Sequence, residues 1–345
     1  MTKVNIISGF LGAGKTTFIK KLIEEVFVGE QLVLIENEFG EIGIDGGFLK
    51  DAGVEITEMN SGCICCTLVG DFSKALKEVL DQYKPDRIII EPSGVGKLSD
   101  VVKAIEGIAE DTDIVIDGKI AVVDGKKAKM YMKNFGEFYN NQVEHASTIV
   151  VSRTQMMTDE QIEACVHLLR EKNEKAAIIS TPWDELKKEA ILHALEQDKE
   201  IADLIHEHHH HDHEEGCTCG CHDHEHEHHN HHHEHGEGCT CGCHNHDHHG
   251  HHHADEVFTS WGKETVHKYT DEELDFILKA LSETEGYGVI LRAKGIIQMA
   301  DGTWKQFDMV PGEYETREGQ ADYTGRLCVI GTNLKEEELK KLFHI

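Results

Sequence analysis

Basic residues are scarce in this chain of 345 residues, which has 34 lysines and arginines against 64 aspartates and glutamates and a formal net charge of −30. A protein this acidic repels the phosphates of nucleic acids and the headgroups of anionic membranes. We therefore expect no general binding to either. The same charge favours cations as partners, and the 27 histidines point to transition metals among them.

Long apolar runs are also missing, since none approaches the roughly 18 residues that a membrane-spanning helix needs. The first residues have neither the basic region nor the cleavage site of a signal peptide. We therefore expect a cytoplasmic protein without membrane association. In a reducing compartment, the 11 cysteines favour metal ligands or buried thiols over disulfides.

The most specific motif lies at the start of the chain, where Val4–Ile7 leads into Gly9, four further residues and then Gly14 to Thr16. An apolar strand, a glycine-rich turn and a helix over Thr17–Val28 follow in the order that a phosphate-binding P-loop requires. In such a loop the backbone N–H groups and a lysine face the phosphates, and a hydroxyl ligates Mg²⁺. The predicted nucleotide-binding residues here are Gly12, Ala13, Gly14, Lys15, Thr16 and Thr17.

Two further predicted strands end in acidic residues. The strand Gln31–Glu36 runs into a loop with Glu38 and Glu41, and Arg87–Ile90 ends at Glu91. Such strand ends face the ligand crevice of an open α/β sheet, where P-loop NTPases place a carboxylate near Mg²⁺. The loop carboxylates could orient water, approach Mg²⁺ or bind a second metal, and a solvated acidic loop is the alternative. The predicted Mg²⁺ ligands are Thr16 and Glu91, and the predicted catalytic residues are Lys15, Glu38 and Glu91.

Three cysteines stand within four residues, at Cys63, Cys65 and Cys66. Three thiolates suit a thiophilic ion such as Zn²⁺ and leave a fourth position for a carboxylate or an exchanging partner. One of the three could instead be a packed core residue, so two ligands are the minimum that the motif predicts.

Four stretches in the order GFLGAGKTT, ENEFGEIGID, GCICC and EPSG resemble the CobW-type members of the CobW/HypB/UreG class of P-loop GTPases. The resemblance covers nearly the whole chain apart from one insertion. It implies a GTP-driven metallochaperone, in which the cysteine motif is a metal site coupled to the nucleotide switch and Glu41 is a neighbouring ligand.

The chain departs from this family after the predicted strand Ser147–Val151. The resembled family has Asn-Lys-x-Asp there and recognises guanine through the aspartate, whereas this chain has Ser152-Arg153-Thr154-Gln155. A neutral glutamine accepts only part of the paired hydrogen bonds of guanine. We expect Ser152 and Gln155 at the base, with GTP implied by the family and ATP left open.

The composition changes abruptly at His206–His253, which holds 22 of the 27 histidines and repeats the sequence GCTCGCH. With almost no aliphatic side chain to bury, this insertion is expected to be disordered without metal. We expect it to buffer or deliver metal, and a solvated linker is the alternative. Its predicted ligands are Cys217, Cys219, Cys221, His222, Cys239, Cys241, Cys243 and His244.

The pattern thus predicts three regions: an α/β P-loop NTPase domain with a mainly parallel sheet (1–205), the insertion (206–253) and a smaller α+β domain (254–345). The first contains two strand segments, Ile114–Ile116 and Ile120–Val123, and closes with a helix from about Asp184 to Ile205. Capping boxes at Thr158 and Thr270 predict two further helix starts.

These features combine into one hypothesis. Nucleotide and Mg²⁺ order the loop Glu38 to Asp45 and change the cysteine site, and hydrolysis passes the ion to a client metalloprotein or a cofactor-synthesis enzyme. From the ligand types we expect Zn²⁺ first, with Co²⁺ and Ni²⁺ as alternatives. A dimer that depends on nucleotide or metal is a further possible partner state. The rival hypotheses are a metal-storage protein with a regulatory P-loop and a P-loop ATPase or kinase in cofactor synthesis.

Overall fold

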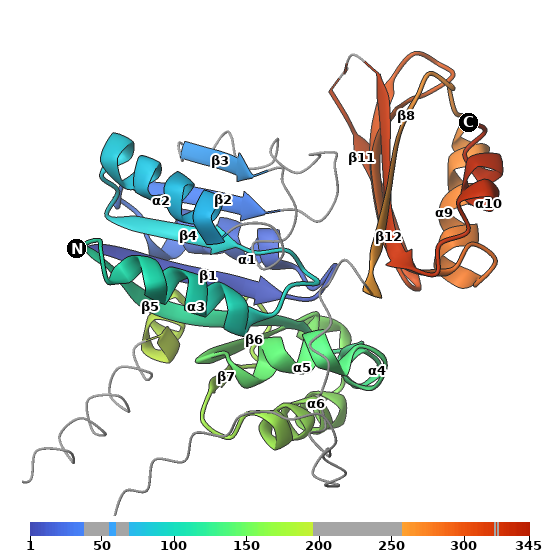
Figure 1. Cartoon of the computed structure of the whole chain (residues 1–345). Coiled ribbons are helices and arrows are strands. Elements are labelled where there is room, and N and C mark those ends of the chain that lie inside the picture. Colours follow the sequence, from blue (N-terminus) through green and yellow to red (C-terminus); the bar gives the residue numbers. More distant parts are fainter. Residues whose placement is uncertain (38–54, 60–68, 196–256, 321, 323) are drawn as a thin grey trace, which may run out of the picture. The chain divides into compact units, whose positions relative to one another are not determined.

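The computed structural model describes residues 1–37, 55–59, 69–195, 257–320, 322 and 324–345 (Figure 1). Several predicted site residues therefore lie outside the described residues. They are Glu38, Glu41, Cys63, Cys65, Cys66 and the eight predicted ligands of the insertion, Cys217, Cys219, Cys221, His222, Cys239, Cys241, Cys243 and His244.

The N-terminal part of the chain forms a seven-stranded sheet with the strand order β3-β2-β4-β1-β5-β6-β7 (Figure 1). All of its pairings are parallel, which confirms the predicted mainly parallel sheet. The strands are β1 (Thr2–Gly9), β2 (Leu32–Asn37), β3 (Glu55–Met59), β4 (Arg87–Glu91), β5 (Ile114–Asp124), β6 (Thr148–Ser152) and β7 (Ala177–Ile179). Because β1 lies between β4 and β5, the P-loop leaves the sheet at its centre.

Helices cover both faces of this sheet, as expected from strands such as β4 and β6 that are buried along nearly their whole length. On β4, Ile88 and Ile90 pack in a core with α2 to α6, while Ile89 packs in a second core with α1. The helices are α1 (Lys15–Lys21), which continues as a π-helical turn (Leu22–Val26), α2 (Val69–Tyr83), α3 (Leu98–Ala109), α4 (Ala128–Asn134), α5 (Gly136–Glu144) and α6 (Asp159–Lys172). No helix in the described part of the chain is long and apolar enough to cross a membrane.

Two predictions about this region were wrong in detail. The two expected segments around residue 118 form the single strand β5, because a register shift between Val4 and Asn5 lets β1 pair along its whole length. The helix expected from Asp184 begins at residue 188, because residues 182–185 form a turn closed by the Glu185 N–H and the Pro182 carbonyl, 3.0 Å apart. The described part of that helix reaches residue 195.

The C-terminal region is a five-stranded antiparallel sheet in the order β11-β10-β9-β12-β8, with α9 and α10 packed on its apolar face. This confirms the smaller α+β structure. Its elements are β8 (Thr259–Thr265), α9 (Asp271–Glu283), β9 (Val289–Gln298), β10 (Trp304–Val310), β11 (Glu313–Glu318), β12 (Gly325–Thr332) and α10 (Glu336–Leu342). Both predicted capping boxes are confirmed, at Thr158 with Gln161 and at Thr270 with Glu273.

Candidate functional site

The P-loop connects the end of β1 to the start of α1. Gly9 has a φ of +147°, and a Cβ atom there would lie 2.3 Å from the carbonyl oxygen of Val122 on β5. Only glycine lets the chain leave the sheet this close to its neighbour. The loop then delivers Lys15 as the first residue of α1, so its side chain starts at a helix N-terminus, where anions are favoured.

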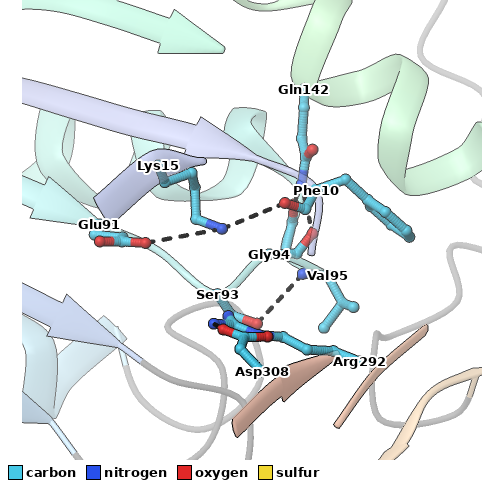
Figure 2. A network of polar contacts seen from close by, with 10 residues as sticks. Phe10, Lys15, Glu91, Ser93, Gly94, Val95, Gln142, Arg292 and Asp308 are labelled. Carbon is cyan, nitrogen blue, oxygen red and sulfur yellow. Dashed lines mark hydrogen bonds and ion pairs between the residues drawn. The ribbon is translucent and has the colours of Figure 1, made fainter. Parts of the chain in front are cut away.

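Lys15 and Glu91 come together at the carboxyl ends of the neighbouring strands β1 and β4. The Lys15 side chain is only 6% exposed, and its Nζ lies 3.8 Å from Glu91 Oε1 and 3.4 Å from the Phe10 carbonyl oxygen (Figure 2). The parallel register of the two strands puts the P-loop and Glu91 at the same sheet edge. The structure therefore brings the buried lysine that is predicted to bind phosphate next to the carboxylate predicted on the Mg²⁺ side.

The loop after Glu91 is held between α5 and the P-loop. Gln142 Nε2 donates to the carbonyl oxygens of Gly94 at 3.0 Å and Gly96 at 2.8 Å (Figure 2). A Cβ atom at Gly94 would lie 2.9 Å from Leu11 Cδ2 and 3.1 Å from the Leu11 nitrogen, so this loop packs directly on the P-loop. No sequence motif points to Gln142, because a lone glutamine in a helix carries none.

A cavity of about 750 Å³ opens beside this pair, and its size falls within the range of small-ligand sites. Every predicted nucleotide-binding residue lines it. These residues are Gly12, Ala13, Gly14, Lys15, Thr16, Thr17, Ser152 and Gln155, and Glu91 lines the same cavity. One cavity thus joins the P-loop to the end of β6.

The end of the cavity next to β6 has an aromatic wall that no sequence motif predicts. Trp183 donates its indole N–H to the Val151 carbonyl oxygen at 3.2 Å, and its ring lies 3.2 Å from where a Cβ atom of Gly14 would stand. Ser152 is buried and donates its hydroxyl to the Val123 carbonyl oxygen at 3.3 Å, whereas Gln155 is exposed. A flat apolar ring beside an exposed amide is a suitable surface for a planar base.

Arg153 holds the same corner of the cavity together. It has a φ of +63°, and its Nε lies 3.0 Å from Oδ2 of Asp124 at the end of β5. Its guanidinium also donates to the Gly12 carbonyl oxygen at 3.4 Å, so it ties the end of β6 to the P-loop. Burial raises the pKa of the Asp124 carboxyl, and the charges of Arg153 and Lys127 oppose that rise. Asp124, at the end of β5, is therefore an ion-pair partner of Arg153.

In the described part of the chain, no group of three or more histidine, cysteine, aspartate or glutamate side chains is arranged to hold a metal ion. Cys165 and Cys328 are buried cysteines in that part, and Cys328 Sγ lies 3.6 Å from the Ser260 hydroxyl. Burial raises the pKa of Cys165 to about 11, so this thiol stays protonated at neutral pH. The described residues therefore offer a phosphate site but no transition-metal site.

Comparison with known proteins identifies both folded regions. Residues 3–180 match the family model of the CobW/HypB/UreG nucleotide-binding domain, and residues 258–344 match that of the cobalamin synthesis protein CobW C-terminal domain. Among curated proteins, the zinc chaperone YeiR of Escherichia coli is 33% identical over 164 residues, which are 48% of this chain and 50% of that protein. The zinc chaperone CobW of a Sinorhizobium species is 40% identical over 126 residues, 34% of this chain and 35% of that protein.

The matched segments thus cover between about a third and a half of these relatives. A solved structure that covers more is that of the Zn(II)-bound YjiA GTPase from E. coli, with 21% identity over 99% of this chain and 98% of that chain and a TM-score of 0.43.

Proposed function

Because the chain belongs to the CobW/HypB/UreG family, we propose that it is a GTP-hydrolysing metallochaperone. It binds a transition metal and passes it to a client metalloprotein or a cofactor-synthesis enzyme under control of the bound nucleotide. The observation that carries the proposal is the pairing of the buried Lys15 with Glu91 on the wall of a ligand-sized cavity. A buried cation beside a P-loop has little structural use and a clear chemical one, since it neutralises phosphate charge.

The phosphate end of the site has a donor set that suits Mg²⁺. Thr16 offers a hydroxyl and Glu91 a carboxylate on the wall of the cavity, and hard oxygen ligands of this kind are the ones Mg²⁺ prefers. When bound, Mg²⁺ would supply charge neutralisation at the β- and γ-phosphates. Lys15 and the P-loop N–H groups hold the phosphates, and Glu38 orients the attacking water.

The residues at the base end of the cavity discriminate less sharply between guanine and adenine than an aspartate would. Ser152 and Gln155 line the cavity where the base is proposed to bind. Gln155 provides a neutral amide where a carboxylate would pair with both N–H groups of guanine. We propose GTP as the main substrate on the strength of the family, with weak discrimination against ATP.

The proposed metal site is Cys63, Cys65, Cys66 and Glu41, which lie in the sequence between the P-loop and Glu91. Three thiolates and a carboxylate favour Zn²⁺ over Co²⁺ and Ni²⁺. The names of several relatives, as zinc chaperones and zinc-regulated GTPase metalloprotein activators, support the same ion. The proposed reservoir is the insertion 206–253, which lies in the sequence between the nucleotide-binding region (1–205) and the C-terminal region (254–345).

Two further proposals concern location and assembly. A cytoplasmic location would keep these thiols reduced and available for metal. A dimer that forms with nucleotide or metal would account for exchange between the proposed cysteine site and a client.

The coupling of metal to nucleotide is tested by measuring GTP and ATP hydrolysis with and without Zn²⁺, Co²⁺ and Ni²⁺. We expect Zn²⁺ to change the turnover or the nucleotide affinity of the wild type, and Cys65→Ser to remove that response. Cys165→Ala is the matched control, because it removes a buried thiol outside the motif. Hydrolysis that ignores every metal, together with full metal capacity after Lys15→Ala, would instead favour a storage protein.

Base selectivity has its own test in the variant Gln155→Asp. A carboxylate at this position would restore the paired acceptor for guanine, so the preference for GTP over ATP should rise by about tenfold or more. Gln161→Asp, in helix α6 and outside the cavity lining, is the control. Unchanged selectivity in Gln155→Asp would mean that the base lies elsewhere.

A further inference from the structure

The β10–β11 hairpin of the C-terminal sheet ends in a tight turn, Val310-Pro311-Gly312-Glu313, here called the hairpin tip. Proline at the second position and glycine with a φ of +79° at the third are typical of a type II turn. The Gly312 N–H donates to the Ser282 carbonyl oxygen at 3.3 Å, and the Tyr314 hydroxyl donates to Asp275 at 2.8 Å. Both partners are on α9, so the hairpin tip is a rigid part of the C-terminal structure.

This tip packs on the P-loop. A Cβ atom at Gly12, which has a φ of +68°, would lie 2.3 Å from Val310 Cγ1. The loop therefore has no room for a side chain at Gly12 while the tip is in place. An apolar contact supports the same arrangement. The ring centroid of Phe258, directly before β8, lies 5.0 Å from that of Phe138 and 6.2 Å from that of Phe10 in the P-loop.

An ion pair then joins the tip to the end of β6. Arg153 donates through Nη1 to Glu313, and the same guanidinium contacts Asp124 and the Gly12 carbonyl oxygen. Burial alone would raise the pKa of Glu313, but the hydrogen bond and charge of Arg153, with the nearby lysines Lys127 and Lys126, lower it overall. A planar guanidinium can reach three acceptors at once, which a lysine ammonium at this position would do less well.

The C-terminal sheet also forms one wall of the cavity described above. Side chains from β9, β10 and β11 line it together with the P-loop, and they include the ion pair of Arg292 with Asp308 at 2.6 Å (Figure 2). The cavity that is lined by Lys15 and Gln155 is thus lined by C-terminal residues as well. They are Arg292, Asp308, Val310, Glu313, Tyr314, Glu315 and Arg317.

We propose that the C-terminal sheet is part of the nucleotide site and that the Arg153–Glu313 ion pair is the latch that keeps it there. The inference rests on the proposed function in one respect, since it takes the ligand to be a nucleoside triphosphate. Nucleotide that contacts both walls favours the closed latch, and by linkage the closed latch favours bound nucleotide. Nucleotide leaves when the latch opens, so the C-terminal sheet responds directly to occupancy of the P-loop.

Charge reversal at Glu313 tests the latch. Glu313→Lys places a cation against Arg153, and Glu318→Lys makes the same change on the same strand but outside the cavity lining. The rate of release of a GTP analogue with an N-methylanthraniloyl fluorophore is measured by stopped flow. We expect release from Glu313→Lys to be about tenfold faster than from the wild type, and release from Glu318→Lys to be unchanged.

Hydrogen exchange without nucleotide gives an independent readout. Amides of residues 310–314 should exchange faster in Glu313→Lys than in the wild type, and the milder variant Glu313→Gln should show the same change to a smaller degree. Equal release and equal exchange in all variants would overturn the latch. If the wild type binds neither GTP nor ATP, the proposed function and the linkage both fail, while the exchange data still decide whether Arg153 and Glu313 hold the two regions together.

Discussion

Two buried cations, Arg87 and Lys15, stand at opposite ends of the same parallel sheet, and their surroundings differ in a way that separates structure from function. Arg87 is the first residue of β4, at the amino-terminal edge, and is 3% exposed. Lys15 follows β1 at the carboxyl-terminal edge and is 6% exposed. The two side chains are therefore buried to nearly the same extent, and they differ in the groups that surround them.

Arg87 is tightly enclosed by its partners. Its Nε lies 2.6 Å from Glu30, its Nη1 lies 2.6 Å from Asp117 and also donates to Asn5, and its Cζ stands 3.8 Å over the ring of Phe27. The guanidinium thus has two carboxylates and an aromatic ring around it. Burial by itself lowers the pKa of Arg87, but the hydrogen bonds and the charges of Glu30 and Asp117 together raise it overall.

The Lys15 ammonium lies 3.8 Å from Glu91 and 3.4 Å from a backbone carbonyl, and both distances are longer than those between Arg87 and its two carboxylates. Hydrogen bonds between charged groups normally measure about 2.7 to 2.9 Å. The ammonium is therefore held less closely by these two groups than Arg87 is by its carboxylates, and the cavity beside it has the right size for a phosphate ligand. Close enclosure by carboxylates thus marks a structural cation, and a position on the wall of a cavity marks a functional one.

The largest expected effect is on stability, from Arg87→Met. Removing a buried cation that holds two carboxylates should lower the free energy of unfolding by about 3 to 5 kcal/mol. Urea unfolding followed by circular dichroism measures it, and the nucleotide affinity of the folded fraction should not change. Lys3→Met is the matched control, because Lys3 is exposed and pairs in register with Arg87. A small effect of Arg87→Met would contradict the structural role.

The next largest effect is on activity, from Lys15→Ala. Loss of a preorganised cation at the phosphates should reduce the rate of GTP hydrolysis by about 100-fold or more. The free energy of unfolding should change less than in Arg87→Met, since the Lys15 ammonium lies farther from its carboxylate neighbour. Lys129→Ala, an exposed lysine outside the cavity, controls for the removal of one charge. Unfolding of Lys15→Ala as severe as that of Arg87→Met would erase the distinction between the two cations.

This difference also explains which parts of the molecule the sequence could predict. Lys15 belongs to a local motif, and strand periodicity placed Glu91 at the same sheet edge. Capping boxes at Thr158 and Thr270 are equally local, and both were confirmed. Helix α3 has Lys97 at its N-cap without a side-chain cap, so no local pattern predicts its start.

Contacts between segments that are distant in the sequence are not marked by any local motif. Asp117 is 30 residues from Arg87, and Glu313 is 160 residues from Arg153. The sequence shows each of these residues as an ordinary charge on a strand or loop. Their partners follow only from strand order and from the packing of the C-terminal sheet, which no local pattern encodes.

A smaller effect separates the two carboxylates that hold Arg87. Asp117 is 9% exposed and Glu30 is 33% exposed. Asp117→Asn should therefore cost about 1.5 to 3 kcal/mol of unfolding free energy, and Glu30→Gln about 1 kcal/mol, because water screens the more exposed partner. The same urea titrations measure both. Equal losses of stability would mean that the enclosure of Arg87 acts through distance alone and not through burial.

The smallest effect is expected from an ion pair that is shorter than that of Lys15 but has a far more exposed carboxylate. Lys21 Nζ stands 2.8 Å from Glu25 one helical turn away, and the Glu25 side chain is 50% exposed. Glu25→Gln should change the free energy of unfolding by less than about 0.5 kcal/mol, because water screens the half-exposed Glu25 carboxylate. A comparison of this variant with Arg87→Met shows whether the length of an ion pair or its burial determines how much the pair stabilises the fold. A destabilisation as large as that of Asp117→Asn would show that short ion pairs stabilise this protein wherever they occur, and the longer distances around Lys15 would then no longer single it out.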